Sequence, residues 1–189
     1  MFALVESGSI TKILNGTRGI TIDGIQHPRA IFSLWTEAER NAIGIYEITI
    51  DNSKRKDEKW YINTDITYAF SGGKVTGSYG DATAKKHADT KWTQQQIDDG
   101  KAPEGADTDT VAVEGLKTVL IRQVKIESES ELNKTDWYVV RKAEESTAIP
   151  SAITTHRRAV RSKAAAMETS ITNASDTPAL ETLYTYTEQ

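Results

Sequence analysis

The feature that most constrains the fold is a change in the spacing of apolar residues along the chain. Before about residue 80, apolar residues come in short or alternating runs. Tyr46, Ile48 and Ile50, for example, fall on one face of an expected strand. From Val113 onward, apolar residues recur every three or four positions, which is the period of a helix. The sequence therefore predicts an α+β protein, with strands in its first half and helices in its second.

Residues 1–90 are predicted to form a small antiparallel β domain that carries one short helix. The expected strands are Phe2–Val5, Ile10–Leu14, Gly19–Ile25, Ile45–Ile50, Trp60–Ile62, Ile66–Phe70 and Lys74–Tyr79. The helix should begin after Thr36, because Thr36 and Glu39 have the spacing at which each side chain binds the other residue's free backbone N–H. Gly44 is expected to end it.

Residues 91–112 are predicted to be a linker, because Asp, Gln, Gly and Pro dominate this segment. Asp98-Asp99-Gly100 and Pro103-Glu104-Gly105 are typical turn sequences within it. Trp92 leaves an alternative open, since tryptophan is uncommon in an exposed linker. A short helix over Asp89–Ile97 would pack that side chain on a neighbour.

Residues 113–189 are predicted to form an antiparallel helical hairpin followed by a short third helix. The first helix carries the apolar positions Val113, Leu116, Leu120 and Val124, and the second, which begins near Pro150, carries Ile153, Val160, Ala164, Met167 and Ile171. Thr177, followed by Pro178 at the expected first helical position, predicts the start of the third. The stretch between the long helices, Thr135–Arg141, is rich in aromatic and β-branched residues and is assigned to neither helix nor strand.

Opposite charges favour pairing of the two long helices. Glu127, Glu129 and Glu131 lie at the end of the first helix, whereas Arg157, Arg158, Arg161 and Lys163 lie near the start of the second. An antiparallel arrangement is expected to bring the two groups together. Each exposed pair contributes only tenths of a kcal/mol, so this pattern predicts orientation more than stability.

Composition argues against nucleic-acid and membrane functions, and against a disulfide framework or a thiolate metal site. The net charge is −4 and the isoelectric point is near 5.5, so the whole chain does not attract phosphate backbones. It has no cysteine, and no apolar run approaches the roughly 18 residues of a membrane span. No signal peptide is apparent at the start. We therefore expect neither a nucleic-acid partner nor a membrane partner.

No motif in the sequence predicts catalysis, a cofactor or a metal. His27, His87 and His156 are dispersed, and none has a second ligand at the spacing of a metal site. The glycines around Gly72–Gly80 lack the order of a phosphate-binding loop, and no nucleophile elbow occurs. We expect a protein that is not an enzyme, with no catalytic residue, cofactor or metal ligand.

The C-terminal half contains a pattern that resembles a known family. An Asp-Trp pair within Thr135–Lys142 is followed by the proline of Ala148–Pro150 and then by Arg157 and Arg161, four residues apart on a helix. This pattern is similar to the C-terminal module of bacteriophage tail-fibre assembly and tail assembly chaperone proteins. The chain departs from it at His156, where an aromatic is commoner, and at Val160, where leucine is. Residues 28–46 resemble the opening of uncharacterised marine phage proteins.

The motif residues are predicted to form a structural clasp. Trp137 would cover the helix pair, Pro150 would set the first turn of the second helix, and Asp136 would pair with Arg157 or Arg161. These five residues are the candidate site. They are expected to hold the module together, and the surface that binds a partner is not identified by the sequence.

The resemblance implies a non-enzymatic phage tail-associated protein that acts through protein–protein interaction. It would be either a virion tail or tail-fibre component or an assembly chaperone, found in the virion or in the infected host cytoplasm. Its partners would be other tail or tail-fibre proteins, or further copies of itself. The alternative is a carbohydrate- or host-binding module. Its aromatic face would consist of residues from the N-terminal part: Trp35, Trp60, Tyr61, Tyr68 and Tyr79.

Overall fold

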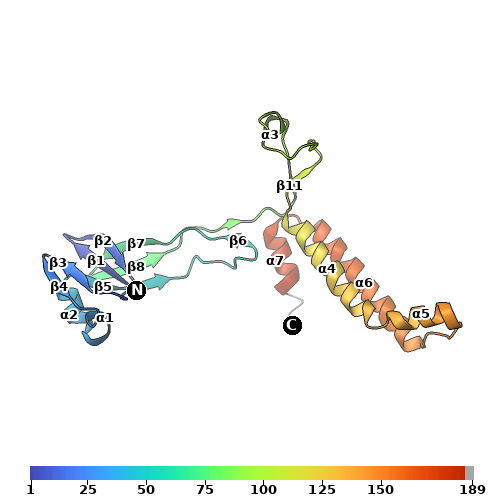
Figure 1. Ribbon diagram of the computed structural model, residues 1–189, viewed down its shortest axis with the longest axis horizontal. Coiled ribbons are helices and arrows are strands. Elements are labelled where there is room, and N and C mark those ends of the chain that lie inside the picture. Colours follow the sequence, from blue (N-terminus) through green and yellow to red (C-terminus); the bar gives the residue numbers. More distant parts are fainter. Residues whose placement is uncertain (186–189) are drawn as a thin grey trace. The chain divides into compact units, whose positions relative to one another are not determined.

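The computed structural model describes residues 1–185 of the 189-residue chain and divides it into two compact units. The first unit is Met1–Thr83 and the second is Ala84–Gln189. Most strands lie in the first unit, and all the long helices lie in the second (Figure 1). The predicted mixture of N-terminal strands and C-terminal helices is therefore confirmed.

The first unit is built on a five-stranded sheet in the order β2-β1-β5-β8-β7. Its strands are β1 (Phe2–Glu6), β2 (Ser9–Leu14), β5 (Ile45–Asp51), β7 (Thr67–Ser71) and β8 (Lys74–Ser78). The prediction of a wholly antiparallel sheet is wrong, because β5 and β8 run parallel, with Ile48 opposite Val75. Parallel neighbours need a long connection, and residues 52–73, which include edge strand β7, provide it.

The segment predicted as one strand over Gly19–Ile25 is a separate two-stranded hairpin. It consists of β3 (Ile20–Ile22) and β4 (Ile25–His27). Asp23 and Gly24 between them have φ of 49° and 78°, the positive values that a tight hairpin turn requires. The Asp-Gly pair therefore reverses the chain where an uninterrupted strand was expected.

Two short helices cover this part of the sheet, where one was predicted. They are α1 (Ile31–Leu34) and α2 (Glu37–Ala42). The capping box of α2 is confirmed, because the Thr36 N–H donates to the Glu39 carboxylate at 2.8 Å and the Glu39 N–H donates to Thr36 Oγ1 at 3.3 Å. Gly44 follows α2 with φ of 79°, as expected of a residue that ends a helix.

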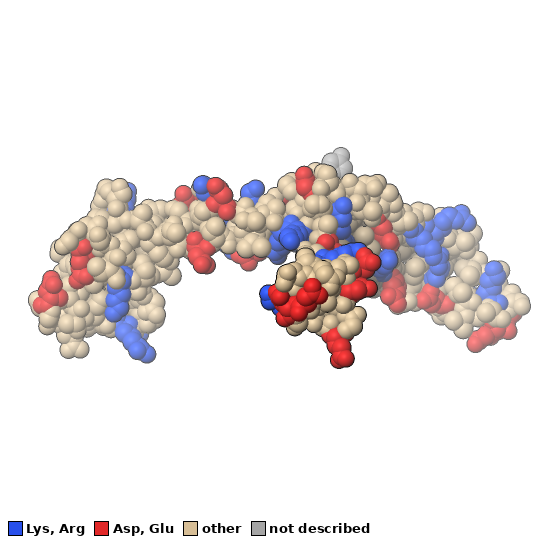
Figure 2. All heavy atoms as spheres, turned by 90° about the horizontal axis from the view of Figure 1, so that it is seen from above, with Lys and Arg blue, Asp and Glu red and all other residues tan. Residues whose placement is uncertain are grey.

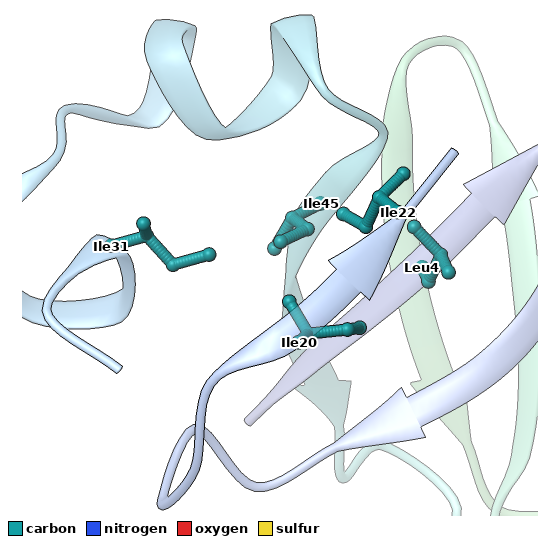
Figure 3. Packing of buried hydrophobic residues seen from close by; sticks show 5 residues of the cluster. All are labelled: Leu4, Ile20, Ile22, Ile31 and Ile45. Carbon is teal, nitrogen blue, oxygen red and sulfur yellow. The ribbon is translucent and has the colours of Figure 1, made fainter. Parts of the chain in front are cut away.

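The sheet buries side chains on both faces. Figure 3 shows one core, in which five residues converge from the sheet, the hairpin and α1: Leu4, Ile20, Ile22, Ile31 and Ile45. The other core consists of Ala3, Val5, Ile48 and Val75. Neighbouring residues of β1 point to opposite faces, so this strand contributes to both cores. A short pair, β6 (Tyr61–Ile62) and β9 (Thr83–Ala84), lies at the end of the unit.

Residues 90–113, part of which composition predicts to be a linker, carry secondary structure of their own. Strands β10 (Thr90–Lys91) and β11 (Val111–Val113) pair antiparallel, with helix α3 (Gln94–Asp98) between them. Trp92 is half-buried, and its backbone N–H donates to the Thr110 carbonyl at 3.1 Å.

Four helices follow between residues 116 and 185 (Figure 1). They are α4 (Leu116–Asn133), α5 (Asp136–Glu145), α6 (Ser151–Asn173) and α7 (Thr177–Thr185). Helices α4 and α6 lie side by side and run in opposite directions. Lys117 near the start of α4 donates to the Thr172 carbonyl at 2.8 Å, whereas Lys125 pairs with Glu168 one turn earlier on α6. The stretch around Trp137, left unassigned from sequence, is helical.

The N-terminal cap of α7 differs from the prediction. The Asp176 carboxylate accepts the Ala179 N–H at 2.8 Å, so Asp176 is the capping residue. Thr177, expected in that role, is buried, and its hydroxyl donates to the Lys85 carbonyl at 2.6 Å. Within residues 1–185, no helix is both long and apolar enough to cross a membrane.

Candidate protein-interaction surface

Arg157 holds together the junction of three helices. Its side chain is almost fully buried, with 7% of the residue exposed. One guanidinium nitrogen donates to the Leu132 carbonyl and to Thr135 Oγ1, both at 2.7 Å, and another lies 2.7 Å from the Asp136 carboxylate. A single side chain of α6 therefore binds the end of α4 and the start of α5.

The acceptors of Arg157 lie at helix ends, where backbone groups and charges are stabilised by a partner. Leu132 lies in the last turn of α4, whose carbonyls lack partners within the helix, and a cation there is favourable. Asp136 is the first residue of α5, where a negative charge is favourable. Arg157 therefore satisfies one helix end and pairs with the residue that stabilises the next.

Helix α5 has no buried residue, although its start is held firmly. Trp137, Val139 and Val140 are 51%, 42% and 52% exposed, and we call them the α5 surface. The Trp137 ring stacks on Tyr138 with centroids 3.8 Å apart, and the Arg141 guanidinium lies 4.8 Å from the Trp137 centroid. Trp137 therefore packs on two residues of its own helix, and about half of its surface is exposed.

The structure brings two of the five candidate residues into direct contact. Asp136 and Arg157 form an ion pair, whereas Arg161 is exposed and forms no ion pair with any described residue. Pro150 is the N-cap of α6, and its carbonyl accepts the Thr154 N–H at 3.1 Å, which is the first bond of that helix.

A hollow of about 400 Å³ lies between α5 and α6. On α6 it is lined by a stripe of residues spaced three and four apart: Thr154, Arg157, Arg158, Arg161 and Ser162. The opposite side is formed by Val139 of α5 and by Ile149 of the connection between the helices. Sequence reasoning missed Val139, Ile149 and Arg158 as site residues. The spacing from Thr154 to Ser162 was the available signal, but it became meaningful only once α5 was known to lie beside it.

The charge pattern predicts that the acidic end of α4 neutralises the arginines of α6. In the structure it does not. Glu131 pairs with Lys134, whose ammonium donates to the carboxylate and lowers its pKa, and Glu127 accepts from Gln123. Arg158 and Arg161 are thus left exposed and without an ion-pair partner among residues 1–185. Figure 2 shows Lys and Arg side chains gathered on the helical unit toward the end that carries α5.

The aromatic residues of the first unit are only partly accessible. Trp60 and Tyr61 are buried, whereas Trp35, Tyr68 and Tyr79 are half-buried. Two of the five residues of the expected carbohydrate-binding face are therefore not accessible to a ligand. Within residues 1–185, His, Asp and Glu side chains form no group of three or more that could hold a metal ion.

No protein-family model, curated protein or solved structure matches the chain.

Proposed function

We propose that the chain is a non-enzymatic bacteriophage tail-associated protein that binds another tail or tail-fibre protein through the α5 surface. The observation that carries this proposal is the exposure of Trp137, Val139 and Val140 on one short helix. Trp137 and Val140 are three residues apart and share one side of α5, whereas Val139 lies on another side of the helix. Exposed apolar side chains that lie together are typical of protein-binding sites, and tryptophan is enriched among the residues that dominate binding energy.

The support beneath α5 favours a preformed binding surface. Arg157 fixes the first turn through Asp136 and Thr135, so the helix does not have to be ordered when a partner binds. Preorganisation of this kind reduces the entropic cost of association. In this proposal the second unit is an antiparallel hairpin of α4 and α6, and α5 is a binding element carried at its turn.

The assignment to a phage tail comes from sequence resemblance. The Asp136-Trp137 pair, Pro150 and the arginines Arg157 and Arg161 resemble the pattern of tail-fibre assembly and tail assembly chaperone proteins, from which the chain departs at His156 and Val160. The exposed Trp137 lies within that pattern, and its exposure supports a role in binding.

Co-purification with tail and tail-fibre proteins of the phage that encodes the chain tests the proposal. The tagged chain is expected to retain at least one of them, and Val140→Lys is expected to weaken retention about tenfold by placing a charge in the contact. Val119→Lys is the matched control, because Val119 is a valine of α4 with 43% exposure, close to the 52% of Val140. Retention of no tail protein, or equal loss in both variants, would contradict the proposal.

Mass spectrometry of purified virions separates the two forms of this function. Stoichiometric presence identifies a virion component. Absence from virions, together with binding to a tail protein during infection, identifies an assembly chaperone.

A further inference from the structure

The hollow between α5 and α6 combines a basic side and an apolar side. Arg158 and Arg161 project from α6, whereas Val139 and Ile149 provide aliphatic surface opposite them. Val139 is also one of the exposed apolar residues of α5, so the hollow lies against the helix that carries the proposed binding surface. A ligand that fits must offer negative charge and an aliphatic group close together.

We propose that this hollow binds an acidic segment of the tail partner that carries an aliphatic side chain between carboxylates. This inference rests on the proposed function and specifies the chemistry of the partner. The aliphatic side chain would lie against Val139 and Ile149, and the carboxylates would pair with Arg158 and Arg161.

Charge complementarity supports this occupant. Arginine presents a planar fork of donors that matches a carboxylate, and the two exposed arginines have no ion-pair partner among the described residues. Arg157 lines the same hollow, but it is nearly buried, and both of its terminal nitrogens already contact Leu132, Thr135 or Asp136. Arg158 and Arg161 are therefore the residues available for a ligand.

A protein segment fits the hollow better than a nucleic acid does. Aromatic side chains that stack on bases accompany arginine in single-strand binding sites, and none lines this hollow. The aliphatic side chains of Val139 and Ile149 offer nothing to a phosphate. The net charge of −4 also opposes approach of a polyanion, whereas a short acidic segment meets mainly the local arginines.

The chain's own acidic segment is a weaker fit. Asp and Glu gather around α3 and the turn that follows it (Figure 2), but most of the aspartates there are bound locally. Asp99 pairs with Lys101, Asp109 pairs with Lys91, and Asp107 accepts from the Thr110 hydroxyl and N–H. A separate partner, with carboxylates free to pair, is therefore the proposed occupant rather than a second copy.

The test measures fluorescence anisotropy of a short labelled peptide in which a central leucine is flanked on both sides by glutamates. Binding to the full chain is expected with a Kd of about 10–100 µM, since the contact area is small. Arg158→Gln combined with Arg161→Gln should weaken it about tenfold or more. Lys163→Gln is the control, because Lys163 is an exposed cation of α6 outside this hollow, and it should change Kd less than about twofold.

Altered peptides and ligands supply the opposing outcomes. Replacing the glutamates by glutamines, or the leucine by serine, should abolish measurable binding. Equal binding of a lysine-flanked peptide would overturn the inference. Tighter binding of a DNA oligonucleotide than of the peptide would overturn it too. The inference would also fail if sedimentation showed that the chain self-associates and that the arginine changes abolish this self-association.

Co-purification of the double arginine variant distinguishes this inference from the proposed function. One outcome is that the unaltered chain retains the tail protein, the Val140→Lys variant loses it, and the double arginine variant retains it as well as the unaltered chain does. In that case the acidic-segment inference fails and the proposed function stands. If no tail protein is retained by the unaltered chain, the proposed function itself fails. Unchanged helical circular dichroism would show that the exposed arginines are not needed for folding.

Discussion

At the scale of single residues, Arg157 does more than a paired charge on the surface. It is nearly buried and donates to three acceptors at the end of α4 and the start of α5. The Leu132 carbonyl also accepts the Thr135 N–H and hydroxyl, at 3.0 Å each, so removal of Arg157 affects mainly the Thr135 hydroxyl and the Asp136 carboxylate. Losing one partner of a buried polar contact costs more than the contact itself contributes.

Arg157→Met is expected to lower the free energy of unfolding by about 2 kcal/mol, because methionine fills similar space but donates no hydrogen bond. Urea unfolding followed by helical circular dichroism measures this change. Arg158→Met is the matched control and should stay within about 0.5 kcal/mol, since Arg158 is exposed. Equal effects of the two substitutions would contradict the central position of Arg157.

Trp137→Ala separates a clasp from a binding surface. Because Trp137 is half-exposed and stacks on Tyr138 of the same helix, we expect the free energy of unfolding to fall by no more than about 1 kcal/mol. Partner retention in the co-purification assay should fall about tenfold or more. A loss of several kcal/mol in thermal or urea unfolding, with binding intact, would restore the clasp hypothesis.

At the scale of elements, the start of α4 is held by the segment before β10. The Leu116 and Lys117 N–H groups donate to the carbonyls of Lys86 and His87, at 3.0 Å each. Gly115, the N-cap, has no side chain to accept a hydrogen bond. The Asp89 carboxylate instead places a negative charge at this helix start, where it accepts the Gly115 N–H and the Thr118 hydroxyl, at 2.7 Å each.

Those hydrogen bonds make the stability of α4 depend on pH. The Gly115 N–H, followed by the Thr118 hydroxyl, lowers the pKa of Asp89. A carboxyl group whose pKa is depressed by folding stabilises the protein above its unfolded pKa, about 3.9, and loses that contribution as the pH falls through its folded pKa. Acidification below about pH 4 should therefore weaken the start of α4.

Asp89→Asn is expected to lower the free energy of unfolding by about 1 kcal/mol at neutral pH, because the amide lacks the charge that favours a helix start. The difference from the unaltered chain should shrink below about pH 4, where Asp89 becomes protonated. Urea unfolding across this pH range measures it. Glu129→Gln, an exposed carboxyl of α4, is the control, and a difference that stays constant with pH would argue against this account.

Steric contact at the same position explains why Gly115 has no side chain. A Cβ built on it would lie 2.3 Å from the carbonyl carbon of Ala88, which is backbone and has little room to move. Its φ of −81° is open to any residue, so the constraint is space and not conformation. The close approach of two chain segments at α4 thus depends on glycine.

At the scale of the whole molecule, each compact unit has buried side chains of its own. Residues 1–83 contain the two cores around the sheet, whereas the buried apolar residues of the second unit lie on or near α4, α6 and α7: Leu120, Val124, Ile171, Ala174 and Leu180. A cavity made in one unit should therefore reduce the stability of that unit.

Leu120→Ala is expected to destabilise the second unit by about 2–4 kcal/mol, because Leu120 is 2% exposed and its loss leaves a cavity. Hydrogen exchange monitored by mass spectrometry should show faster exchange in α4 and α6, with residues 1–83 unchanged. Val119→Ala, at the neighbouring exposed position, is the control. Equal acceleration in both units would contradict separate cores.

The sequence by itself determined the elements whose signals are local. The apolar period placed strands first and helices second, and the spacing of Thr36 and Glu39 predicted a capping box that closes through bonds within one turn. The Asp23-Gly24 turn was local as well, but it was read as part of a strand because the apolar residues continue on both sides.

Only the tertiary structure decided features that depend on distant partners. The parallel pairing of β5 with β8 depends on how the chain crosses between them, which periodicity does not encode. Helix α5 forms although its aromatic and β-branched residues favour strands. Asp136 and Arg157 are 21 positions apart in the sequence. Only the packing of α4 against α6 brings them together, and their ion pair holds the start of α5. The same packing placed Val139 opposite the arginine stripe and so created the hollow, because the two sides belong to different elements.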